Sequence, residues 1–129
     1  MPNQLVNTVG TYNPDNLIGG DYPLVTEGVL VASGQGILPR GSVLGVITAA
    51  GNANLGKYLL SAAAANDGSQ NPVCILADHA DTTSGDATSE AYITGEFCID
   101  ALTFGTGQSA TTTTNALRDL NIYLKQSRS

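Results

Sequence analysis

The segment Gly51–Tyr58 comes nearest, among the segments of this chain, to a nucleotide-binding motif. It reads GNANLGKY, and it lies between the apolar run VLGVITAA and the stretch LLSAAAA. A phosphate-binding loop has this glycine and lysine spacing, but a Ser or Thr must follow the lysine, because that hydroxyl binds Mg²⁺. Tyr58 stands in that place. We therefore interpret GNANLG as a tight turn between two antiparallel strands, in which glycine supplies positive φ.

The polar segment DHADTTSGDATSE (residues 78–90) combines the single histidine of the chain with several carboxylates. Counted from Asp78 as a calcium loop, it has Thr83 where Gly is needed and Ser89 where Glu is needed. His79 could serve a Ser-His-Asp triad, but no GxSxG sequence is present to hold the serine. We therefore predict a protein that is not an enzyme and has no catalytic residues, metal site or cofactor.

The composition narrows the range of partners. Only 12% of the 129 residues are charged, against about 25% in an average soluble domain. The net charge is −6, from 5 Lys and Arg against 11 Asp and Glu. Nucleic acids and anionic membranes bind clustered Lys and Arg, and the sequence has no such cluster. We therefore expect no nucleic-acid or membrane partner, whereas the sparse surface charge favours association with a protein or with further copies.

The start of the chain and its cysteines indicate the compartment. The opening MPNQLVNTVG carries no secretory signal, and no apolar run reaches the length of a membrane span, so we expect synthesis in the cytosol. Cys74 and Cys98 are then expected to be buried, reduced thiols. A disulfide between them stays open, because the sequence cannot supply its geometry.

Apolar periodicity predicts one mainly β domain over residues 24–129, with one or two short helices. Turn-forming Gly, Pro, Asn and Asp separate the apolar runs. The strands are expected at residues 24–32, 42–48, 55–61, 72–78, 91–102 and 121–126. A short helix is expected in NALRDL, capped by Thr113 or Thr114, with Ala116, Leu117 and Leu120 toward the core.

The run AYITGEFCIDAL alternates with period two, which is typical of a half-buried strand. The alternation places Ala91, Ile93, Phe97, Ile99 and Ala101 on one face, and we expect this face, with Phe97 and Ile99, to be directed toward the core. Glu96 falls on the opposite face, where we expect it to meet solvent.

Residues 1–23 differ from the rest of the chain. They are rich in Asn, Gly and Pro, and they contain no Lys or Arg. Only Leu5–Val9 is strand-prone. We predict a flexible N-terminal arm over residues 1–23, and the alternative is a disordered terminus that contacts nothing.

Several segments occur together in one known family. They are LPRGSVLGVIT (38–48), GKYLL (56–60), DGSQNPVCILADHAD (67–81), AYITGEF (91–97) and LRDLNIYL (117–124). In this order and spacing they resemble the head decoration proteins of tailed bacteriophages, the family of the phage lambda decoration protein D. The resemblance covers about residues 26–124. The FCID sequence and the long TFGTGQSATTTT segment depart from the family pattern.

The resemblance implies a small β-rich fold, tulip-like or barrel-like, and a structural role. Such proteins sit as homotrimers on the outer surface of the expanded head and stabilise it against internal DNA pressure. It further implies that the N-terminal arm binds the major capsid protein. The candidate arm residues are Leu5, Val6, Asn7, Thr8, Val9 and Tyr12. The alternative is a small β-domain of a phage tail or fibre that binds glycans, but such sites use stacking aromatics, and this chain has no Trp.

Overall fold

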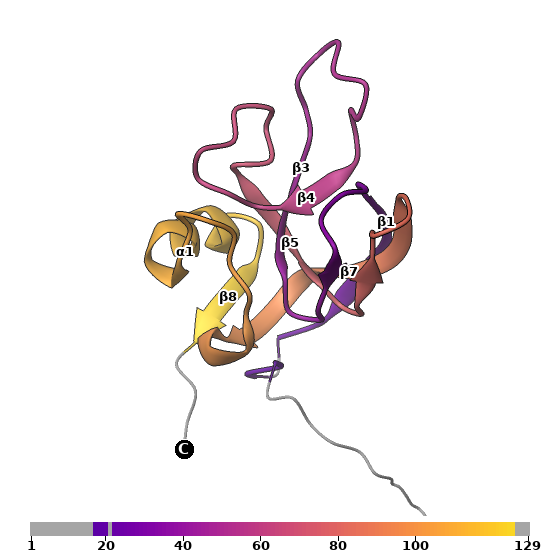
Figure 1. Ribbon diagram of the computed structural model, residues 1–129. Helices are drawn as coiled ribbons and strands as arrows, with labels where there is room; N and C mark the ends of the chain where they lie inside the picture. The colour runs from indigo at the N-terminus through magenta and orange to yellow at the C-terminus, as the bar shows by residue number, and fades with distance from the viewer. Residues whose placement is uncertain (1–16, 21, 126–129) are drawn as a thin grey trace, which may run out of the picture.

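The computed structural model describes residues 17–20 and 22–125, and these form eight short strands, one 3₁₀ turn and one α-helix (Figure 1). In chain order they are β1 (Val25–Val31), β2 (Ile37–Leu38), β3 (Val43–Val46), β4 (Tyr58–Leu60), β5 (Pro72–Leu76), β6 (Ala80–Asp81), β7 (Ala87–Cys98), η1 (Ile99–Ala101), α1 (Ala110–Arg118) and β8 (Ile122–Lys125).

Five strands close into a barrel in the order β1-β4-β3-β5-β7, because β7 also pairs with β1. Strand β8 joins the end of β7 outside this ring, and β2 and β6 form a separate two-stranded sheet. The prediction of a mainly β, barrel-like domain is confirmed. Not every pairing is antiparallel, however, since β1–β4 and β7–β8 are parallel. Each parallel pair is joined by a long connection that passes through other elements, as parallel pairing requires.

The barrel has a core on each side of its wall. The interior cluster contains Val29, Val31, Leu38, Leu44, Cys74, Leu76, Ala80 and Ala91. The second cluster contains Leu17, Val43, Ile75, Phe97, Leu117 and Ile122, and it joins the barrel wall to α1 and β8. Strands β3 and β5 therefore bury side chains on both faces, which explains why PVCIL is an almost unbroken apolar run.

Strand β7 changes face at Gly95. Ala91 and Ile93 pack on the interior cluster, whereas Phe97 packs in the second cluster beside Tyr92, with ring centroids 5.3 Å apart. Phe97 is fully buried, as predicted. The prediction that it shares one face with Ala91 and Ile93 is wrong, because the φ of 147° at Gly95 interrupts the alternation. The strand also ends earlier than predicted, because a 3₁₀ turn begins after Cys98.

Helix α1 begins earlier than predicted. Ser109 is its N-cap and forms a capping box with Thr112. The Ser109 hydroxyl accepts from the Thr112 N–H at 3.4 Å, and the Thr112 hydroxyl accepts from the Ser109 N–H at 2.8 Å. Thr113 and Thr114, the predicted caps, lie inside the helix. Of the side chains expected to face the core, Leu117 is buried, whereas Ala116 and Leu120 are exposed.

Candidate functional site

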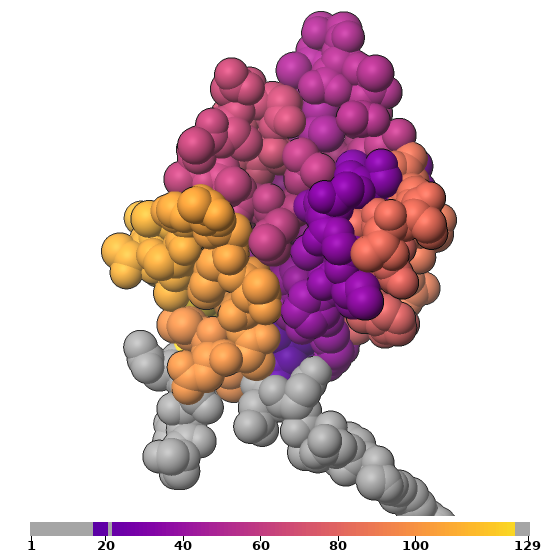
Figure 2. Space-filling view, viewed as in Figure 1, coloured from indigo at the N-terminus to yellow at the C-terminus, as the bar shows by residue number. Residues whose placement is uncertain are grey.

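The segment GNANLGKY forms the connection of the β3–β4 hairpin, which projects as a lobe at one end of the molecule (Figure 2). Gly51 and Gly56 have φ of 83° and 88°, and the flanking strands are antiparallel, as predicted. The predicted tight turn is wrong, however, because the connection runs from residue 47 to residue 57. Tyr58 begins strand β4 rather than a helix, so the loop has no helix N-terminus to receive a phosphate. The Lys57 ammonium lies 2.7 Å from the Asp86 carboxylate and holds the hairpin against the β6–β7 loop.

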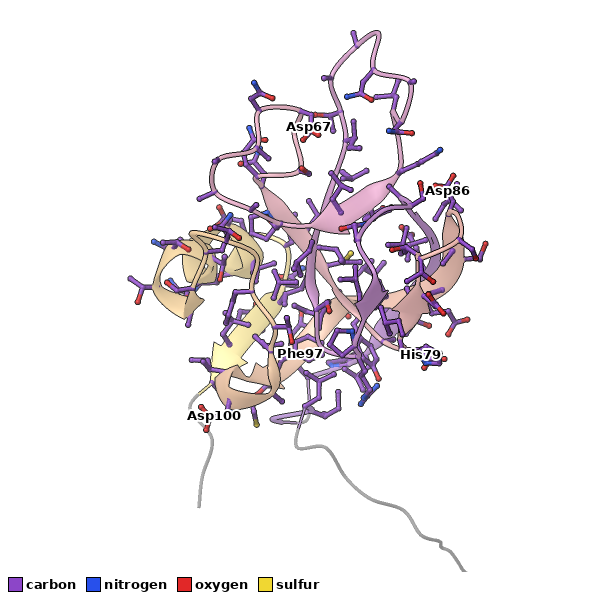
Figure 3. All side chains as sticks on the ribbon, viewed as in Figure 1. Asp67, His79, Asp86, Phe97 and Asp100 are labelled. Atoms are coloured by element: carbon purple, nitrogen blue, oxygen red, sulfur yellow. The ribbon has the colours of Figure 1, made fainter. Side chains whose placement is uncertain are left out.

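Each carboxylate of residues 78–86 has a partner within the protein: Asp78 and Asp81 bond to residues next to them in the sequence, whereas Asp86 bonds to Lys57 and to the Ser33 N–H. Asp78 accepts from the backbone N–H of His79 at 2.8 Å, and Asp81 accepts from the Thr83 hydroxyl at 2.6 Å. This hydroxyl lowers the pKa of Asp81. Figure 3 shows His79 and Asp86 well separated on the surface. Within residues 17–20 and 22–125, no group of three or more His, Cys, Asp or Glu side chains is arranged to hold a metal ion.

The two cysteines are free and differ in their surroundings. Cys74 is 2% exposed inside the barrel, and burial raises the pKa of its thiol to about 12. Such a thiol stays protonated at neutral pH and is a poor nucleophile. Cys98 is only half-buried, so the prediction of two buried thiols holds for Cys74 alone.

The predicted arm residues Leu5, Val6, Asn7, Thr8, Val9 and Tyr12 lie outside the described residues. The described chain begins at Leu17, which is 1% exposed and packs in the second core cluster. Its carbonyl accepts from the Cys98 N–H at 2.8 Å, and the Gly19 N–H donates to the Glu96 carbonyl at 2.7 Å. Residues 17–19 thus run antiparallel to the end of β7, on the opposite side from β8.

Glu96 ties this segment to the last strand. One carboxylate oxygen accepts from the Tyr22 N–H at 3.0 Å, and the other lies 2.7 Å from the Lys125 ammonium. The hydrogen bond from Lys125 is the main reason that the pKa of Glu96 is lowered. Tyr22 also packs edge-on against Tyr123, with centroids 5.1 Å apart. The Glu96 side chain is only 19% exposed, so the prediction that it faces solvent is wrong.

A pocket of about 420 Å³ opens beside this ion pair. Its walls come from the segment before β1, the end of β7, helix α1 and strand β8, and the lining residues are Tyr22, Glu96, Thr114, Arg118, Tyr123, Leu124 and Lys125. Arg118 lies in the last turn of α1, where a cation interacts favourably with the helix dipole. No local sequence pattern indicates this pocket, because its lining residues come from positions 22, 96 and 114–125.

The described chain begins and β8 ends at the same side of the molecule, opposite the β3–β4 hairpin (Figure 1). A family model described as bacteriophage lambda head decoration protein D matches residues 6–123, which is nearly the whole chain. The chain belongs to this family. The head decoration family is structural, so the protein decorates the phage capsid and is part of the virion.

No curated protein matches the sequence of this decoration protein. Across the described ranges, no helix has both the length and the apolar character needed to cross a membrane.

Proposed function

We propose that this decoration protein binds the outer surface of the expanded phage head as a homotrimer and stabilises the head against the pressure of packaged DNA. The observation that carries the proposal is the family match over residues 6–123, which includes most of the predicted arm as well as the barrel. The net charge of −6 is consistent with a position away from DNA, and the low charged fraction suits a protein held in permanent contact.

The proposed partner is the major capsid protein, and the proposed contact is strand addition by the N-terminal arm. Leu5, Val6, Asn7, Thr8, Val9 and Tyr12 would supply main-chain hydrogen bonds and alternating side chains to a coat-protein strand. Ordering each residue costs about 1–2 kcal/mol, so one arm binds weakly on its own. Three arms joined in one trimer would bind with far higher avidity.

Stabilisation of the head follows from linkage. A protein that binds the expanded lattice, and no earlier or ruptured form of it, lowers the free energy of that lattice alone. Occupancy at 100 times the dissociation constant contributes about 2.7 kcal/mol for each site. Over many sites this contribution raises the temperature and the internal pressure at which the head ruptures.

Deletion of residues 1–12 tests the proposal. Leu17 and Gly19 keep their bonds to β7 in this variant, so its melting temperature should match that of the full chain. We expect weaker binding to expanded empty heads in co-sedimentation, and a lower rupture temperature of the decorated heads. Light scattering and the symmetry of the bound density would report the trimer.

A length-matched pair of variants separates the arm's apolar residues from its mere presence. Replacing Leu5, Val6 and Val9 with Ser should reproduce the deletion, whereas replacing Asn3 and Gln4 with Ser should leave binding unchanged. Binding of the truncated protein with full affinity would show that attachment does not use the arm. Single copies at scattered positions on the head would contradict the trimer.

A further inference from the structure

The pocket beside Glu96 concentrates positive charge in an acidic protein. The chain has five Lys and Arg, and four of them lie in the described residues. Two of these four, Arg118 and Lys125, line this one pocket. Lys125 is paired with Glu96, whereas the Arg118 guanidinium makes no ion pair or side-chain hydrogen bond within the described part of the chain. The pocket therefore carries a net positive charge, with one cation available to a ligand.

The rest of the lining is typical of a protein-binding hot spot. Tyr22 and Tyr123 meet edge-on, and Leu124 adds an aliphatic wall. Tyrosine and arginine are enriched among the residues that dominate interface energetics. The chain has only five Tyr, two Phe and no Trp, so two of its seven aromatic side chains line this single pocket.

The pocket also lies where the proposed arm joins the barrel. Tyr22 lines the pocket, and residues 17–19, which lie just before Tyr22 along the chain, are hydrogen-bonded to the end of β7. If residues 1–16 bind the coat protein, the coat protein must pass close to this end of the molecule, where β8 also ends (Figure 1).

We propose that the pocket receives a carboxylate-bearing segment of the coat protein, bound by the Arg118 guanidinium and by the Tyr22 and Tyr123 rings. This inference rests on the proposed function. Arginine presents a planar fork of N–H donors to a carboxylate, and such charge-assisted bonds are about twice as strong as neutral ones. The contact would fix the orientation of the barrel on the head, whereas the arm supplies the tether.

The test compares Arg118→Gln with Lys57→Gln for binding to expanded empty heads. Both variants lose one positive charge, but Lys57 lies in the β3–β4 hairpin, at the opposite end of the barrel. Loss of a hydrogen bond to a charged group corresponds to a decrease of about 10- to 100-fold in affinity. We expect this decrease for Arg118→Gln and no decrease for Lys57→Gln. Arg118→Lys should recover part of the loss, and the affinity of the full chain should fall more steeply with salt than that of Arg118→Gln.

Each other outcome overturns the inference in a recognisable way. Equal affinities for Arg118→Gln and the full chain, at equal melting temperatures, would show an empty pocket while the proposed function stands. Loss of the trimer in Arg118→Gln would assign the pocket to a second copy. A double-mutant cycle in which Asp15→Asn accounts for the loss would assign it to the chain's own N-terminal segment. Failure of the full chain to bind heads would remove the proposed function, and the inference with it.

Discussion

Leu17→Ala tests whether the segment before β1 is an integral part of the fold. The side chain is 1% exposed and packs in the cluster that contains Phe97, and truncation of such a leucine costs about 2–5 kcal/mol. The segment is also held by the bonds of Leu17 and Gly19 to β7 and by the bond of Tyr22 to Glu96, each worth about 0.5–1.5 kcal/mol. The segment can also detach from β7 while the barrel stays folded, and the decrease in the free energy of unfolding then cannot exceed the free energy with which the segment binds. We therefore expect Leu17→Ala to lower the free energy of unfolding by about 2–4 kcal/mol.

Urea unfolding measures this change. With a slope of about 2 kcal/mol/M, the midpoint should fall by about 1–2 M. Leu120→Ala is the matched control, because the same atoms are removed from a side chain that is 42% exposed, and its effect should stay within about 0.5 kcal/mol. Equal, small shifts in the two variants would refute the packing of Leu17.

Three further predictions follow from particular contacts. Gly45→Ala should destabilise the barrel by about 1–3 kcal/mol, because the new Cβ would lie 2.0 Å from the Ser69 carbonyl oxygen. Thermal unfolding measures this change, and an unchanged melting temperature would contradict the close approach. A thiol reagent should label Cys98 in the native protein and Cys74 only after denaturation; rapid native labelling of both would mean that the barrel opens readily. Glu96→Gln should lower the melting temperature at pH 7, because a carboxyl group whose pKa is lowered stabilises the fold above its ordinary pKa of 4.5. This contribution is lost as the pH falls through the lowered pKa. The difference in melting temperature between Glu96→Gln and the unmodified protein should therefore disappear in acid.

Local sequence predicted the elements whose signal is local. The positive φ of the glycines in GNANLG was predictable because they connect two apolar strands, and Gly51 and Gly56 both adopt it. The start of α1 was not predicted correctly, because four consecutive threonines are all possible N-caps. Ser109 is the N-cap in the structure, where it forms a capping box with Thr112. The switch of Phe97 to the other face of β7 was not predicted, because Gly95 has no side chain and so leaves the apparent alternation of the sequence unbroken.

The candidate site was beyond local patterns because tertiary pairing builds it. Glu96 looked like a solvent-facing residue of an alternating strand, and its two partners lie 74 residues before it and 29 residues after it. Leu17 stands in a stretch that reads as part of an arm, and only the free edge of β7 gives it a place to pack. The family resemblance could predict the capsid role from ordered segments, but it could not place this pocket.

The pairing that closes the barrel also sets when the chain can fold. Val25 pairs with Thr94, which lies 69 residues later in the sequence, so β1 has no antiparallel partner until β7 has been synthesised. At 5–20 residues per second, the ribosome takes roughly 3–14 s to make that interval. During this delay the core cluster that buries Val29 and Val31 lacks the side chains of β7, and the edge of β1 that later pairs with β7 is open to pairing with other chains. Folding of this decoration protein is therefore expected to be essentially post-translational, and a product that terminates before β7 should aggregate rather than form a partial barrel.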